Sequence, residues 1–277
     1  MSTSSDGVRK MTKESIVDAS IPSAGRIYDY FLGGHHNFEV DRRAAEEILI
    51  RLPFLSKLSR LQRWCLQDIG QELTAVRGFD TIIDFASGLP TQDHLHTVVP
   101  SGTTVIYSDY DPVVVEYARE ILGDTPGTYF FEADARRPEE LLNNPEITDI
   151  LNGKRDVAIV YWGVGGFLTD EEISYAADVF FDWAGPTSTW AFNAQGAEGK
   201  SDQVRADEVL QIYRQMGTPF YLRSLSRYKE LVQPWRPDDQ GFVNFLDWHS
   251  FDESVIGDED VGVFGEAGTG FGAYLIK

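Results

Sequence analysis

Three aspartates follow short apolar runs at a regular spacing of 25 residues, namely Asp84 in "TIIDF", Asp109 in "VIYSDYD" and Asp134 in "YFFEAD". A carboxylate at the end of a strand can accept hydrogen bonds from both hydroxyls of a ribose. It can also accept one from an exocyclic amine such as N6 of adenine. The three residues and their spacing therefore predict a nucleoside-binding site.

Each carboxylate in these turns also has a structural alternative. Asp111 precedes Pro112, a pattern typical of an N-cap followed by proline in the first helical turn. Asp134 could instead form an Asx turn ahead of a helix that begins at Pro138. We expect Asp109 to contact ribose, Asp134 to contact adenine and Asp111 to serve as the cap.

The turn after the first apolar run, "DFASGLPT" at residues 84–91, has small residues where a backbone must approach a ligand. Ala86 and Gly88 permit that approach, and the start of a helix follows. The turn is not the GxGxxG dinucleotide fingerprint, because Ala86 and Pro90 stand at two of its glycine positions. After the fourth run, "YWGVGGF" at 161–167 combines aromatics with glycines and can form a pocket wall.

Four of the five histidines fall in two pairs, His35–His36 and His94/His96. Imidazole is a common metal ligand, but no H-E-x-x-H spacing is present and adjacent histidines rarely bind one ion together. We therefore predict no metal site. His35 and His36 remain candidate general bases, because histidine titrates near neutral pH. The alternative is a polar pocket lining or an exposed surface.

The N-terminal run "RIYDYFLGGHHNF", residues 26–38, places an arginine, four aromatics and a Gly-Gly pair in thirteen residues. The Arg26 guanidinium can pair with a ligand carboxylate, and Tyr28 can cover a ligand cation. Gly33 and Gly34 would permit a tight turn. We interpret the run as a lid over a bound small molecule. The alternative is a strap that only packs on the core.

Short β-rich runs alternate with helical segments in the rest of the chain, which predicts βαβ units and a parallel sheet with helices on both faces. The C-terminal segment at 270–277 has the composition of a strand and no helix after it, so we expect it to pair at a sheet edge. The expected strands are 79–85, 103–111, 127–134, 155–162, 187–195, 219–224 ("PFYLRS") and 270–277 ("GFGAYLIK"), and the expected helices are 91–98, 112–122, 138–151, 170–183 and 202–216.

Apolar residues recur at spacings of three and four from Asp41 to Val76, which predicts a helical region with Pro53 near its start. Cys65 lies on this apolar stripe and is expected in the core. We divide the chain into a disordered tail at 1–20, a lid and helical cap at 21–78, and one sheet domain at 79–277. The acidic stretch "FDESVIGDED" is expected to be a solvated loop.

The composition excludes several classes of protein. A net charge of −20 argues against binding to nucleic acid phosphates, and no apolar run reaches the length of a membrane span. The N-terminus lacks the apolar core of a secretory signal. A single cysteine excludes an internal disulfide framework and suits a reducing cytoplasm. We expect a cytoplasmic protein that has neither nucleic acid nor a membrane as its partner.

In this order, the motifs resemble those of a class I S-adenosylmethionine-dependent methyltransferase. More narrowly, the chain resembles the actinobacterial S-adenosyl methyltransferase family, formerly a domain of unknown function. The resemblance runs from about residue 21 to residue 240. It is carried by P-x-x-x-R-I-Y-D-Y-x-L-G-G-x-x-N-F-x-x-D-R near the N-terminus, "GLPT" with His96 downstream, "DYDPVV" and "WRPD".

The resemblance implies a Rossmann-like class I methyltransferase fold: a mostly parallel sheet, helices on both faces and an N-terminal helical cap. It implies S-adenosylmethionine as cofactor, with Asp84 and the 86–91 turn near the methionine moiety. A sulfonium is already activated, so methyl transfer to a small-molecule acceptor needs alignment more than acid–base groups. The candidate cofactor-binding residues are Arg26, Tyr28, Asp84, Ala86, Gly88, Pro90, Thr91, Asp109, Tyr110, Asp134, Ala135 and Tyr161.

The chain departs from the family pattern at several positions. His35–His36 replace Lys-Asp, His94 replaces Asn, Ala86 replaces a glycine, and Gly165–Gly166 replace Leu-His. The last change would either widen the acceptor site or mark a loss of catalysis. Two alternatives therefore remain. One is a non-catalytic sensor of S-adenosylmethionine or a partner-binding protein. The other is a nicotinamide oxidoreductase, which the missing GxGxxG and Tyr-x-x-x-Lys motifs disfavour.

Overall fold

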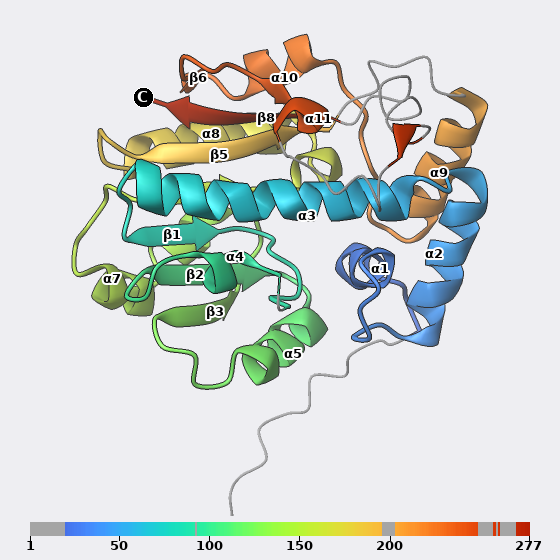
Figure 1. Ribbon diagram of the computed structural model, residues 1–277, viewed down its shortest axis with the longest axis horizontal. Helices are drawn as coiled ribbons and strands as arrows, with labels where there is room; N and C mark the ends of the chain where they lie inside the picture. Colours follow the sequence, from blue (N-terminus) through green and yellow to red (C-terminus); the bar gives the residue numbers. More distant parts are fainter. Residues whose placement is uncertain (1–19, 92, 196–202, 249–256, 259, 261–269) are drawn as a thin grey trace, which may run out of the picture.

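A mostly parallel sheet forms the centre of the computed structural model, which describes residues 20–91, 93–195, 203–248, 257–258, 260 and 270–277 (Figure 1). Five parallel strands run in the order β3–β2–β1–β4–β5. This arrangement confirms the predicted Rossmann-like fold. The strands are β1 (Thr81–Asp84), β2 (Thr104–Asp109), β3 (Thr128–Glu132), β4 (Ala158–Tyr161) and β5 (Thr189–Ala194).

Helices cover both faces of the sheet because alternate residues of each strand point to opposite sides. Ile82 of β1 packs with α3 (Leu55–Gln71), α4 (Leu95–Val98), α5 (Pro112–Leu122) and α11 (Phe245–Trp248). Its neighbour Ile83 faces α6 (Pro138–Leu142), α7 (Pro145–Leu151), α8 (Asp170–Trp183) and α10 (Leu225–Leu231). Two apolar cores therefore sandwich the strands.

The C-terminal strand departs from the predicted arrangement. β8 (Phe271–Ile276) pairs antiparallel with β5, as a strand without a following helix can. It is not an edge strand, because β6 (Arg236–Pro237) and β7 (Val243–Asn244) pair with its other side. The predicted strand at 219–224 was wrong. That segment has no sheet pairing, and the N–H of Tyr221 instead donates to the Gly166 carbonyl at 2.6 Å.

The helical region predicted for 41–76 is divided into two helices. The first, α2 (Glu39–Arg51), is followed by its C-cap residue Leu52, which precedes Pro53 and has ψ 77°. A residue before proline is forced out of the helical region by contact with the proline ring. α3 then begins at Leu55 and continues into the π-helical turn η1 (Glu72–Val76). Cys65 is fully buried on α3, as expected.

Three helices lie together beyond the sheet and share a small apolar core of their own. These cap helices are α1 (Ala24–Phe31), α2 and α9 (Gln203–Gln215). Figure 1 shows them grouped at one end of the molecule, with α3 running from them across the sheet. Ile27 and Ile48 are fully buried there against Val209 of α9. The N-terminal cap thus includes a helix that is far away in sequence.

Arg26 joins the cap helices to the sheet domain. Its Nε donates to Asp41 of α2 and its Nη1 to Asp111, each at 2.8 Å, and Nη2 donates to the Ile21 carbonyl at 2.8 Å. Asp111 also caps α5, as predicted, by accepting from the Val113 N–H at 2.9 Å. Arg26 is only 3% exposed, so this ion-paired cluster is dry.

The turn after α1 folds around Asp29. Its carboxylate accepts from the His36 N–H at 2.9 Å and from the Asn37 amide at 2.8 Å. A Cβ at Gly34 would lie 2.0 Å from this carboxylate, so only glycine fits there. Much of the 26–38 run therefore serves the folding of the run itself. Residues 1–19 and most of the acidic stretch at 251–260 lie outside the described residues.

We predict that Arg26→Met lowers the free energy of unfolding by about 3–5 kcal/mol, because it leaves the buried Asp41 and the largely buried Asp111 without their cation. Urea denaturation followed by circular dichroism measures the change. Arg43→Met is the control, since Arg43 pairs with Glu39 on the exposed surface of α2. Equal effects of the two substitutions would contradict the anchoring role of Arg26.

Candidate active site

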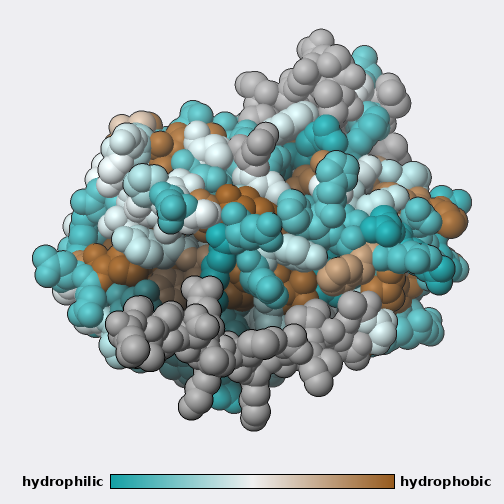
Figure 2. All heavy atoms as spheres, turned by 90° about the horizontal axis from the view of Figure 1, so that it is seen from below, coloured by the Kyte–Doolittle hydropathy of each residue, from teal (hydrophilic) through white to brown (hydrophobic). Residues whose placement is uncertain are grey.

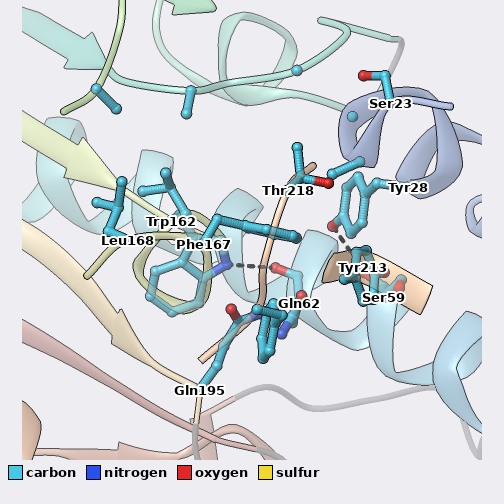
Figure 3. A pocket seen from close by; sticks show the side chains of 18 of the residues that line it. Ser23, Tyr28, Ser59, Gln62, Trp162, Phe167, Leu168, Gln195, Tyr213 and Thr218 are labelled. Atoms are coloured by element: carbon cyan, nitrogen blue, oxygen red, sulfur yellow. Dashed lines mark hydrogen bonds between the residues drawn. The ribbon is translucent and has the colours of Figure 1, made fainter. Parts of the chain in front are cut away.

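A cavity of about 510 Å³ lies between the carboxyl ends of the parallel strands and the cap helices. In open α/β sheets, ligands bind at this edge. Figure 3 shows Tyr28, Gln62, Trp162 and Gln195 reaching the cavity from separate segments of the chain. The sheet supplies one side of the cavity, and α1, α3 and α9 supply others.

The structure brings the three predicted aspartates together in the lining of this cavity. Asp109 is 6% exposed, and its carboxylate accepts from the Gly88 N–H at 3.1 Å and from the Asp111 N–H at 2.9 Å. These bonds aim the side chain across the turn that follows β1. Burial raises the pKa of the Asp109 carboxyl to about 6. The carboxylate therefore gains its full charge only above weakly acidic pH.

The backbone of the turn after β1 has the conformation for which small residues are best suited. Ala86 and Gly88 both have positive φ, 52° and 63°, and both line the cavity. An L-residue in this region costs about 1–2 kcal/mol, which explains why the family pattern has glycine where this chain has Ala86. Ser87 ties the turn to β2 through bonds with Ser108. Pro90 and Thr91 were predicted to contact the cofactor, but they do not line the cavity.

Asp134 lines the same cavity, as do Tyr110, Ala135 and Arg136. Burial alone would raise the pKa of Asp134, but a two-pronged ion pair with Arg136 lowers it, so the group is a carboxylate. Tyr161 was placed in the site by the sequence analysis. Its ring is instead buried beneath the site, where its hydroxyl donates to the Ala135 carbonyl at 2.7 Å.

The cavity also holds two buried ionisable groups, a guanidinium and a carboxyl, with atoms that lack hydrogen-bond partners. Nε and Nη1 of Arg63 have none, although Nη1 lies 3.7 Å from the exposed carboxylate of Asp93. Oδ2 of Asp84 has none either. Burial raises the pKa of Asp84 well above its usual range, while the charge of Arg63 opposes that shift. Buried polar atoms in this state are available to hydrogen-bond a ligand.

The histidine predictions are corrected by the structure. His35 is exposed, His36 packs its ring on Tyr117 at 5.4 Å, and neither lines the cavity. The turn around Asp29 directs both away from it. His94 lines the cavity, but its Nδ1 accepts from the Leu95 N–H at 2.9 Å to cap α4. Burial lowers the pKa of His94 well below its usual range, so the ring is neutral.

Arg26 was predicted to bind the ligand carboxylate, and the structure corrects this too. Its guanidinium is occupied by Asp41 and Asp111 and does not line the cavity. Arg63 is the arginine in the lining. Tyr28 does line the cavity, as predicted, and its hydroxyl donates to the Ser59 carbonyl at 3.1 Å. The Tyr28 ring also lies 5.6 Å from the guanidinium carbon of Arg63.

Sequence reasoning missed the contribution of α3. Ser59, Gln62 and Arg63 are buried polar residues on this helix, and all three line the cavity. Their spacing of three and four residues places them on one helix face. A polar patch inside an amphipathic apolar stripe is the signal that could have identified them. Trp162 lines the cavity beside this helix face, and its Nε1 donates to the Gln62 carbonyl at 3.0 Å (Figure 3).

The fold and this site define a class I S-adenosylmethionine-dependent methyltransferase. The sequence matches the S-adenosyl methyltransferase family over residues 10–270, and the chain belongs to that family. The match extends beyond the 21–240 span of the motifs. The protein is therefore an S-adenosylmethionine-dependent enzyme, and the nicotinamide alternative has no support. None of the curated proteins compared matches the sequence.

Two solved structures share the whole fold. A DUF574 family protein from Streptomyces avermitilis has a TM-score of 0.83 and 26% identity, covering 94% of this chain and 99% of that one. A candidate methyltransferase from Thermobifida fusca has a TM-score of 0.83 and 25% identity, covering 96% of this chain and 98% of that one. This chain is similar to both over nearly its full length.

The residues present fit S-adenosylmethionine. Its methionine part is a zwitterion, and Asp84 and Arg63 offer a carboxyl and a guanidinium that each have atoms without a hydrogen-bond partner. Asp109 fits the ribose and Asp134 the adenine amine, each as a hydrogen-bond acceptor. The described residues contain no group of three His, Cys, Asp or Glu side chains arranged to hold a metal. Methyl transfer from a sulfonium requires none.

We predict that Arg63→Met selectively weakens recognition of the amino-acid moiety. The wild type should bind S-adenosylhomocysteine far more tightly than 5′-methylthioadenosine, which lacks that moiety. The variant should bind the two with similar affinity, because the buried cation is lost. Isothermal titration calorimetry measures both ligands. Arg60→Met, an exposed arginine on the same helix, is the control. An unchanged preference in Arg63→Met would refute the assignment.

Cofactor affinity should fall as the pH drops below about 6, because ribose hydroxyls donate best to an ionised Asp109. A protonated Asp109 must first release its proton. Asp109→Asn should weaken binding at pH 7.5 by about 1–3 kcal/mol and reduce the loss between pH 7 and pH 5. Titrations with S-adenosylhomocysteine across this range test both effects, with the exposed Glu132→Gln as control. An unchanged pH profile in Asp109→Asn would exclude Asp109 as the titrating group.

Proposed function

We propose that this methyltransferase acts on a small molecule that binds in the same cavity as the cofactor. The observation behind the proposal is that a single cavity has two chemically different parts. The strand ends supply the charged and polar groups described above. The lining residues from α1, α9 and residues 217–222 are mostly apolar, including Phe31, Val209 and Phe220.

The described groups perform the tasks that such a transfer requires. Asp109, Asp134 and Arg63 bind and orient a cofactor whose sulfonium supplies the activated methyl group. Tyr28 and Trp162, which are distant in sequence, both line this space (Figure 3). Alignment of two reactants at contact distance supplies much of the rate in this chemistry. The neutral, hydrogen-bonded His94 is not suited to serve as a base.

The surface favours a soluble acceptor over a macromolecular or lipid one. On the coloured part of the face in Figure 2, hydrophilic residues surround separate hydrophobic patches. The net charge of −20 repels nucleic acid phosphates. No helix in the described parts of the chain has the length and apolar composition needed to cross a bilayer. We therefore extend the proposal to a cytoplasmic enzyme without nucleic acid or membrane partners.

We predict that the full-length enzyme transfers a deuterated methyl group to small molecules in a metabolite extract. Cofactor labelled with CD3 should produce low-mass species with the corresponding mass increase, detected by mass spectrometry. Asp109→Asn should reduce their yield, because it weakens cofactor binding. Label appearing only in protein or nucleic acid would refute a small-molecule acceptor. Cofactor binding without any transfer would favour the sensor alternative.

A further inference from the structure

Three aromatic rings form a continuous surface on the part of the cavity contributed by α9 and residues 217–222. Phe167 meets Phe220 edge-on at 4.9 Å and Tyr213 edge-on at 5.6 Å, and Tyr213 lies 5.9 Å from Phe220. All three line the cavity. We call these residues the aromatic wall. Burial keeps the Tyr213 hydroxyl neutral by raising its pKa, so the wall carries no charge.

The aromatic wall is held in place by the turn after β4. A Cβ at Gly166 would lie 2.3 Å from the Phe220 ring, so the absence of a side chain there makes room for this ring. The Gly166 carbonyl accepts from the Tyr221 N–H at 2.6 Å. Arg223 donates to the Gly165 carbonyl at 3.1 Å and to Asp170 at 2.6 Å. The Gly165–Gly166 departure from the family pattern therefore builds an aromatic surface rather than an open space.

Two buried polar atoms beside the wall have no hydrogen-bond partner. They are Oε1 of Gln195 and Oγ1 of Thr218, and both residues line the cavity. Figure 3 shows the two side chains in the same lining as Phe167 and Tyr213. Buried polar groups in folded proteins are nearly always hydrogen-bonded. Together they offer a ligand one amide and one hydroxyl.

This part of the cavity is unsuited to an anionic ligand. Among the described lining residues, none from α1, the 52–55 segment, α9 or residues 217–222 is charged. A carboxylate or phosphate bound against the wall would lose its hydration without gaining a counter-ion. A neutral ring, in contrast, gains edge-to-face contacts with several aromatic side chains.

From these observations we infer that the aromatic wall binds a neutral aromatic compound carrying a hydroxyl or N–H group, which hydrogen-bonds to Gln195 or Thr218. This inference rests on the proposed function, because it names the class of acceptor. The wall supplies the shape and the apolar contact area. The two polar residues set the orientation of the ring in its plane.

Isothermal titration of the full-length protein, saturated with S-adenosylhomocysteine, tests the inference without requiring turnover. The probes are 2-naphthol, naphthalene and 2-naphthoate, which share a ring system and differ in hydrogen bonding and charge. We expect 2-naphthol to bind at least tenfold more tightly than 2-naphthoate. Comparable binding of the two, or no binding of 2-naphthol, would overturn the inference.

Two variants test the named residues. Phe220→Ala should weaken binding of 2-naphthol about tenfold or more by removing part of the wall. Thr218→Val keeps the side-chain shape and should weaken 2-naphthol about three- to tenfold while leaving naphthalene unchanged. Tyr129→Ala, a partly exposed aromatic on β3, should change neither. Unaltered affinity for S-adenosylhomocysteine shows that each variant is folded. If both folded variants bind 2-naphthol as tightly as the wild type, the inference is overturned.

The titration tests the aromatic wall, and the labelling experiment tests the proposed function, so either one can fail while the other succeeds. Selective binding of 2-naphthol supports the inference whatever the labelling experiment yields. Labelled products that are charged or aliphatic would overturn the inference while leaving a small-molecule acceptor in place.

Discussion

The arrangement of the site depends on one buried cation. Arg26 lies between Asp41, at the start of α2, and Asp111, at the start of α5. Asp111 is two residues from Asp109, whose carboxylate faces the cavity. The guanidinium therefore ties the cap helices to the strand end that carries Asp109, the residue expected to bind the ribose. In a dry environment such an ion pair is strongly directional, so it fixes the cap helices relative to the sheet.

A second pair of ionisable groups, unlike Arg26 and its two carboxylates, is left without full hydrogen-bond partners. Asp84 and Arg63 are buried beside the cavity without full partners, which is costly for each of them. A zwitterionic ligand offsets both costs at once. Several of the described residues with unpartnered buried polar atoms, these two among them, line the cavity, while the charges of Arg26 that support the fold are paired. The same contrast separates Arg26 from Arg63, two arginines that are about equally buried.

The local sequence was sufficient to predict the five parallel strands and the aspartates, but not the antiparallel part of the sheet. Strand ends are marked by the change from apolar residues to Asp84, Asp109 and Asp134, and no distant contact is needed to find them. Arg63 and the aromatic wall could not be predicted in this way, because they meet only through packing of α3, α9 and the turn after β4. The N-terminal motif was misleading for a physical reason. Several of its polar residues bind one another, so its specificity reflects folding as much as ligand binding.

Among the described residues, the small core of the cap helices shares no buried residue with the two cores that sandwich the sheet. Its third helix, α9, comes from the second half of the chain and also lines the part of the cavity that we propose for the acceptor. Residues there can change over evolutionary time without disturbing the strands that carry the cofactor groups. Related enzymes can therefore diverge in what they methylate while the methyl donor stays the same. Comparison of α9 and residues 217–222 among relatives should sort them by acceptor more sharply than comparison of whole sequences.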